Sequence, residues 1–340
     1  ALIGAAMFTP VASAHDSPND GHIPKDVNYG FELIGRDTLA GVSEFGNYTD
    51  VWSHNGFAYI GTFQEPCSDA GVFIVDIDAA ISQFQADGSI SGATVADIKS
   101  APNTRINDVQ VHSGGDTDGL IAAQEPCGMQ IPGWAQSGGA APFQVGQGGI
   151  SLYDVTDPAK PKALKKNYLE FEGVHNTFPW TDSSTGKSYL IGTADTFDFF
   201  DTFFVDISKP QSPKLLTITG ALDWLAAGAF GDGQFETGSS AGIFNHDVTV
   251  EVINGTPTAV VSYWDVGFVT LDVTDPANPL FLDDSTYVDP EPIIGEPYEG
   301  NAHAAVFGGK GDYIFGGDED FSPSSFAISY DGVDYPAGVA

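Results

Sequence analysis

The strongest constraint on the fold is a short segment that recurs along the chain. Each copy alternates β-branched or aromatic residues with others and ends in Asp followed by a polar turn, which is typical of a strand that stops at a turn. In three copies a Pro closes the turn. The four copies are residues 71–78, 150–158, 203–210 and 269–276.

A predicted hairpin precedes each copy, and a fifth hairpin follows the last one. The hairpins begin 57 to 71 residues apart. Short apolar strands also follow the Pro-containing turns, at residues 163–164, 214–216 and 280–282. Four strands per repeat predict an all-β fold, a β-propeller of four-stranded blades with five repeats visible. Residues 31–39 are predicted to be a lone strand that completes a blade, and we expect further blades beyond Ala340.

The repeats resemble those of a known family. Residues 73–77 and 150–158 are similar to the motif of the LVIVD-repeat proteins, which are cell-surface propellers of the choice-of-anchor B type. The resemblance covers roughly residues 31–317 and implies an exported surface propeller without implying a particular activity. Long loops at residues 128–149 and 222–242 depart from the family pattern.

Charge excludes several partners. The chain has 46 Asp and Glu against 12 Lys and Arg, a formal net charge of -34. Repulsion from phosphates argues against nucleic-acid binding and against anionic membrane surfaces. Hydrophobic residues still make up 42% of the chain, enough for a packed core rather than disorder. An acidic surface of this kind suits a salty, halophilic exterior.

The N-terminal sequence predicts export. Residues 1–14 are small and apolar and end in the A-x-A pattern of a signal-peptide cleavage site, so we interpret them as a signal remnant. We expect residues 15–30 to be flexible and residues 31–340 to form the propeller, in an extracellular or cell-surface protein with no membrane span. Cys67 and Cys127 lie in identical Gln-Glu-Pro-Cys contexts, which favours a disulfide over two unpaired thiols in an oxidising compartment.

Two columns of polar residues align across the hairpins. One column begins the first strand of each hairpin and the other ends the second strand, and antiparallel pairing places both at the same edge of a sheet. We expect them to meet at one mouth of the propeller channel. The candidate metal ligands are His175, His246, His303, Asp50, Asp108, Glu65, Glu125, Asp195, Asp265 and Asp318.

The chemistry of these columns leaves two interpretations open. Imidazoles with carboxylates suit a divalent Zn, Mn, Fe or Cu ion, and carboxylates alone suit Ca²⁺. Alternatively, each polar residue hydrogen-bonds the backbone of the neighbouring blade. His54 and His112 fall in predicted hairpin turns, where we expect them to face solvent.

The motifs that the sequence lacks argue against nucleotide-dependent functions but leave several other classes open. The sequence contains no P-loop, dinucleotide fingerprint or nucleophile elbow, so we expect no nucleotide cofactor. The sequence favours an exported binding module, with a metal site, for a protein, glycan or cell-surface matrix partner. The alternative is a metal-dependent hydrolase or oxidase, including a lactonase-like Ca²⁺ enzyme, and the sequence does not decide whether the chain is an enzyme.

Overall fold

The computed structural model describes most of the repeat region of the chain. The described residues are 48–62, 71–87, 92–114, 117–126, 148–170, 173–194, 201–229, 244–264, 267–285, 302–318, 328–330 and 333–335.

Four sheets of four strands follow one another along the sequence. The first sheet contains β1 (Tyr48–His54), β2 (Phe57–Thr62), β3 (Gly71–Asp76) and β4 (Thr94–Lys99). The second contains β5 (Thr104–Gly114), β6 (Thr117–Pro126), β7 (Gly149–Asp154) and β8 (Lys162–Tyr168). The third contains β9 (Val174–Asp182), β10 (Lys187–Ala194), β11 (Thr202–Asp206) and β12 (Lys214–Thr219). The fourth contains β13 (Asn245–Ile253), β14 (Thr256–Tyr263), β15 (Gly267–Asp272) and β16 (Leu280–Asp284).

Two hairpins and two helices complete the described elements. The hairpins pair β17 (Ala302–Gly308) with β18 (Tyr313–Asp318) and β19 (Ile328–Tyr330) with β20 (Val333–Tyr335). The helices are α1 (Ile77–Asp87) and α2 (Ala221–Ala227). Within the described residues, neither helix combines the length and the apolar character needed to cross a membrane.

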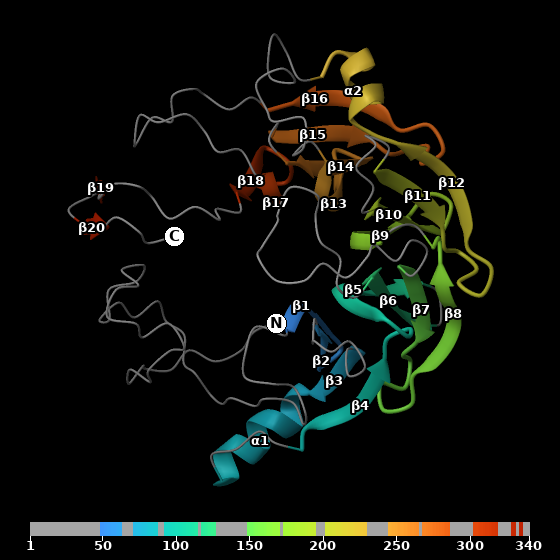
Figure 1. The fold of residues 1–340 in the computed structure, drawn as a ribbon, viewed down its shortest axis with the longest axis vertical. Helices are drawn as coiled ribbons and strands as arrows, with labels where there is room; N and C mark the ends of the chain where they lie inside the picture. Colours follow the sequence, from blue (N-terminus) through green and yellow to red (C-terminus); the bar gives the residue numbers. More distant parts are fainter. Residues whose placement is uncertain are drawn as a thin grey trace.

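The sheets form a propeller-like fan. Each four-stranded sheet is an antiparallel meander in chain order. Figure 1 shows the sheets succeeding one another around a centre, with β1, β5, β9, β13 and β17 innermost and β4, β8, β12 and β16 at the periphery. The predicted all-β fold with repeated four-stranded sheets is therefore confirmed for four repeats. The described part of the fifth repeat has two strands, and residues 31–39 lie outside the described residues.

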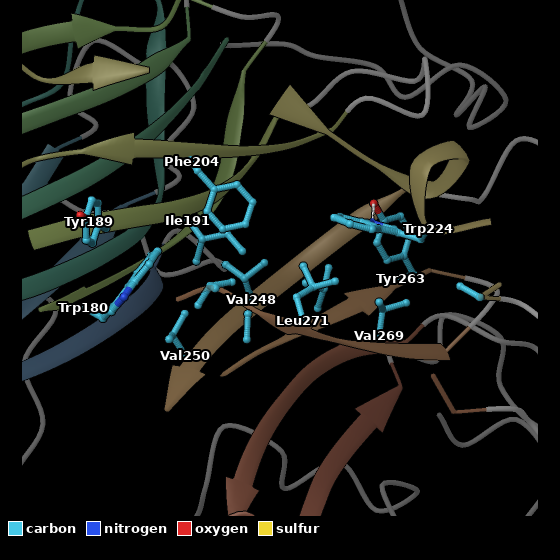
Figure 2. Packing of buried hydrophobic residues seen from close by; sticks show 14 of the residues in the cluster. Trp180, Tyr189, Ile191, Phe204, Trp224, Val248, Val250, Tyr263, Val269 and Leu271 are labelled. Carbon is cyan, nitrogen blue, oxygen red and sulfur yellow. Dashed lines mark hydrogen bonds between the residues drawn. The ribbon is translucent and has the colours of Figure 1, made fainter. Parts of the chain in front are cut away.

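The core lies between consecutive sheets, and strand alternation distributes side chains to both faces. In β6, Leu120 and Ala122 pack toward the first sheet, whereas Ile121 and Ala123 pack toward the third. Both faces of the sheet are buried here, so residues 120–123 of β6 form a continuous apolar run in the sequence. Figure 2 shows the equivalent layer between the third and fourth sheets, which also includes Trp224 of α2.

The repeated Asp forms the turn that follows each third strand. Its carboxylate accepts a hydrogen bond from the backbone N–H two residues later at Asp154, Asp206 and Asp272. This arrangement is an Asx-turn. In the first sheet, Asp76 instead accepts from the N–H of Ala79 at 2.8 Å and begins α1. The sequence did not indicate this helix, because Asp is common both in turns and at the residue before a helix.

Candidate functional site

Every inner strand carries a β-bulge near its start. In β13 the pairing steps from Asn245 to Asp247 while β14 advances by one residue, which leaves His246 in the bulge. The same irregularity leaves Asn107 in β5 and His303 in β17. In β1 and β9 the bulge contains two residues, which are residues 49–50 in β1 and residues 175–176 in β9. A bulged residue is released from the in–out alternation of the sheet, so these side chains are free to point at the centre.

The three predicted histidines lie against one another. The Nε2 atoms of His175 and His246 are 3.0 Å apart. The rings of His246 and His303 have centroids 4.3 Å apart and planes inclined by 39°. Because β9, β13 and β17 belong to consecutive sheets, the bulges bring together imidazoles that are far apart in the sequence.

Both facing imidazoles are engaged at their other nitrogen. His175 Nδ1 lies 2.5 Å from Glu125 Oε1. His246 Nδ1 lies 3.2 Å from the carbonyl oxygen of His303 and donates to it, because a carbonyl can only accept. Both Nε2 atoms are therefore left to face each other.

Glu125 lies in the site but does not face it as a ligand. Its other oxygen, Oε2, accepts from Nε and Nη2 of Arg105, both at 2.9 Å. The side chain is only 1% exposed. Burial alone would raise the pKa of Glu125, but His175 and Arg105 outweigh burial and lower it. With both oxygens occupied, the glutamate acts as a partner of His175.

Asp108 does not occupy the predicted column, because it lies one residue after the position that aligns with His246. The bulge makes Asn107 the equivalent of His246 and aligns Asp108 with Asp247. Asp108 is buried and accepts from the backbone N–H of Thr177 at 2.9 Å and from its hydroxyl at 2.7 Å, which ties β5 to β9. The sequence missed this shift because a bulge leaves no signature in composition.

Two further carboxyls join these groups. Burial, followed by the charge of Asp50 and a hydrogen bond with it, raises the pKa of Asp108 well above its usual range. Burial also raises the pKa of Asp247 to about 7. We call the six residues of the site the rim cluster: His175, His246, His303, Asp50, Asp108 and Asp247.

The electrostatics of the rim cluster disfavour extra charge on the central ring. Burial, followed by the neighbouring imidazoles of His175 and His303, lowers the pKa of His246 to about 2. Burial followed by His175 also lowers the pKa of His303. His246 is therefore a neutral imidazole at physiological pH, which is the form that binds metals.

An aromatic pair flanks His246 and was not predicted. Phe244 and Trp264 stack with ring centroids 5.3 Å apart, and the Trp264 ring lies 5.1 Å from that of His246. Trp264 is buried, so the pair fixes one side of the imidazole. The sequence offered one signal for this pair: Phe244 directly precedes β13, which carries His246, and Trp264 directly follows the paired strand β14.

The other predicted ligands are placed as follows. Asp318 is exposed and lies opposite Ala302 at the end of β18. Glu65, Asp195, Asp265, Cys67 and Cys127 lie outside the described residues. Among the described residues, no group of three or more His, Cys, Asp or Glu side chains is arranged to surround a metal ion. The described residues of the site offer two facing imidazole nitrogens, Nε2 of His175 and Nε2 of His246.

The interpretation based on backbone hydrogen bonds also finds support. Asn107 donates to the carbonyl oxygen of His175 at 2.8 Å, just as His246 donates to that of His303. Bulged residues therefore link the second sheet to the third and the fourth sheet to β17. His246 differs from Asn107 because its second nitrogen remains directed at the centre.

The prediction that His112 faces solvent is wrong. His112 ends up part-buried within β5, where its Nε2 contacts Thr181 Oγ1 at 2.8 Å and Ser188 Oγ at 3.0 Å in the third sheet. The predicted turn begins later than expected because β5 runs on to Gly114. His54 lies in β1 and pairs with Asp118 at 3.1 Å.

Comparisons with known proteins give no family. No protein-family model and no curated protein matches the chain. Among solved structures, an exo-β-1,3-galactanase from Phanerochaete chrysosporium matches with 8% identity and a TM-score of 0.40, over 73% of this chain and 51% of that one. Raptor from Chaetomium thermophilum matches with 10% identity and a TM-score of 0.39, over 72% and 18%.

A third match is a β-fructofuranosidase from Bombyx mori, with 9% identity and a TM-score of 0.35, over 68% of this chain and 49% of that one. The chain spans about half or less of the length of these three proteins. At such low TM-scores the matches carry no functional argument.

Proposed function

We propose that the chain is a metal-dependent enzyme, a hydrolase or oxidase, and that His175 and His246 bind a divalent transition-metal ion through their Nε2 atoms. The observation that carries the proposal is the 3.0 Å approach of two Nε2 atoms whose Nδ1 partners are already fixed. Metal-binding histidines almost always engage their other nitrogen with a carboxylate or a carbonyl. Here His175 engages the carboxylate of Glu125, and His246 engages the carbonyl of His303.

The donor atoms indicate the class of metal. The two nearest donors are imidazole nitrogens, which suit Zn, Cu, Fe or Mn better than Ca²⁺. A bound ion of this class supplies a Lewis acid and an activated water. With two protein nitrogens facing, the remaining positions are open to water, to substrate or to His303 after a rotation of its ring.

The rest of the rim cluster supports such a role through charge and shape. Asp247 lies within electrostatic reach of His175 and Asp50, and with a pKa of about 7 it can take up or release a proton near neutral pH. Trp264 covers one side of His246 and keeps water from that face. Buried titratable groups of this kind are typical of reaction centres more than of docking surfaces.

The test is metal binding with variants that remove only Nε2. Asparagine keeps a donor near the position of Nδ1, and Asn107 shows that such a donor makes the link to the next sheet. The protein is stripped with EDTA, and isothermal titration calorimetry follows Zn²⁺, Mn²⁺ and Cu²⁺ binding. We expect one ion per chain for the wild type and a loss of affinity of about 100-fold or more in His175→Asn and His246→Asn, beyond the usual outer-shell effect.

The matched control is His54→Asn, which removes an imidazole from another inner strand. It should bind metal like the wild type. Turnover of chromogenic esters, phosphate esters and phenols is then compared for the stripped and reloaded protein. A wild type that binds none of the three ions, or a His246→Asn variant that binds them equally well, refutes the proposal.

The wider setting is also a proposal. The charge of -34 and the repeated strand motif support an exported, LVIVD-like propeller at the cell surface, with a Cys67–Cys127 disulfide. We propose further that residues 31–39 form an outer strand that completes a blade supplied by the C-terminal part of the protein. If the chain is instead a binding module for a protein, glycan or matrix partner, metal should bind without any metal-dependent turnover.

A further inference from the structure

A buried ion pair controls the orientation of His175. Glu125 divides its two oxygens between two partners, with Oε1 on His175 Nδ1 and Oε2 on the Arg105 guanidinium. The glutamate side chain is 1% exposed and that of Arg105 is 17% exposed. Neither partner can be replaced by bulk water without moving the strands, because Arg105 and Glu125 are cross-strand neighbours in β5 and β6.

This pairing dictates which nitrogen of His175 carries a proton. A carboxylate that is paired with Arg105 is acceptor-only, so Nδ1 must be the donor. In the neutral ring the lone pair then lies on Nε2 and points at His246. His246 presents its own Nε2 lone pair because its Nδ1 donates to the carbonyl of His303.

We infer that Glu125, held by Arg105, is a positioning residue that keeps a proton on Nδ1 of His175 and so makes Nε2 the nitrogen that faces His246. The significance for metal binding rests on the proposed function, but the tautomer itself does not. Two lone pairs at this distance would repel, so a proton or a cation is favoured between the two Nε2 atoms.

Glu125→Gln inverts this arrangement in a defined way. The two Arg105 donors require an acceptor, so the amide oxygen of the glutamine must face Arg105. Its NH₂ group must then face His175 Nδ1, which becomes an acceptor, and the ring proton moves to Nε2. In the neutral ring, that Nε2–H donates to Nε2 of His246 and leaves no lone pair on His175 Nε2 for a metal ion.

A second variant should restore the native tautomer. In Arg105→Met/Glu125→Gln the guanidinium is gone, so the amide can turn its oxygen to His175 and accept from Nδ1 again. This double variant also leaves no buried charge without a counter-ion, which protects against loss of folding. The pair of variants separates the effect of the tautomer from the effect of lost charge.

The experiment is ¹⁵N–¹H long-range correlation NMR on histidine-labelled protein, with His175 assigned by its loss in His175→Asn. We expect Nδ1 of His175 to be protonated in the wild type, pyridine-like in Glu125→Gln and protonated again in the double variant. Signals of His54 and His112 should not change. Zn²⁺ affinity should fall 10- to 100-fold, about the usual outer-shell effect, in the single variant and recover in the double variant.

The outcomes separate this inference from the proposed function. A protonated Nδ1 in Glu125→Gln overturns the inference. An inverted tautomer with unchanged Zn²⁺ affinity overturns the claim that the tautomer serves metal binding. If the wild type binds no Zn²⁺ while the tautomer inverts as expected, the proposed function fails and the positioning role of Glu125 stands.

Discussion

The buried carboxyl of Asp201 should make the stability of the protein depend on pH in a predictable direction. Asp201 lies directly before the third-sheet strand β11 and is 1% exposed. It accepts from the backbone N–H of Asn245 and from the Tyr263 hydroxyl at 2.8 Å. Burial is the larger influence and raises the pKa of Asp201 from 3.8 to about 6.

The sign follows from linkage. Between pH 3.8 and about 6 the folded state binds more protons at this site than the unfolded state, so stability falls as the pH rises through this window. At about 1.4 kcal/mol per pH unit, the full loss is about 3 kcal/mol. Above pH 6 the contribution stays constant.

Asp201→Asn removes the titration and keeps the hydrogen bonds. The amide oxygen can accept from Asn245, and the NH₂ group can donate to the Tyr263 hydroxyl, which already accepts from Trp224 Nε1 at 3.2 Å. The stability of the variant minus that of the wild type should therefore rise by up to about 3 kcal/mol from pH 4 to pH 7. Other titrating groups cancel in this difference.

The measurement is urea unfolding of both proteins across this pH range, with the exposed Asp157→Asn as control. The control difference should stay flat with pH. A flat difference for Asp201→Asn would show that folding leaves the pKa of Asp201 at its usual value. A difference that falls with pH would mean that the partners of Asp201 outweigh its burial.

Three further substitutions test the packing and the links between sheets. Leu190→Ala removes a fully buried side chain between the second and third sheets and should cost about 2–5 kcal/mol, measured by chemical denaturation; a cost below 1 kcal/mol would contradict that core. Asn107→Ala deletes the bond to the His175 carbonyl and should cost about 1 kcal/mol, with hydrogen exchange rising in β9; unchanged exchange there argues against the link. Asp76→Ala removes the N-cap of α1 and should cost about 1 kcal/mol, with faster exchange in the first turn of the helix; protection equal to that of the wild type would deny the cap.

The sequence was sufficient for the repeat architecture because each strand carries its own local signal. Alternation and the turn after Asp154, Asp206 and Asp272 depend on residues next to one another. Helix α1 was missed because its strand ends in the same Asp as the other three. The local difference was the missing Pro, since Asp76 is followed by Ile-Asp-Ala-Ala and the other three Asp residues by a turn that ends in Pro.

The site could be predicted only in part, because its details depend on partners that are distant in the sequence. The histidine column was visible since His175, His246 and His303 occupy matching places in successive hairpins. The bulge beside Asp108 and the pairing of Glu125 with Arg105 arise only when strands pair, so no spacing along the chain indicates them.

The bulges on the inner strands separate the chemistry of the centre from the architecture of the sheets. A residue in regular strand pairing has to suit the packing layer on its side of the sheet. Asn107, His246 and His303 lie outside that alternation, yet each lies at the same level of its own strand. Exchanging their side chains should therefore change the groups presented at the centre while strand register is kept, as long as the bonds that Asn107 and His246 make to the next sheet are retained.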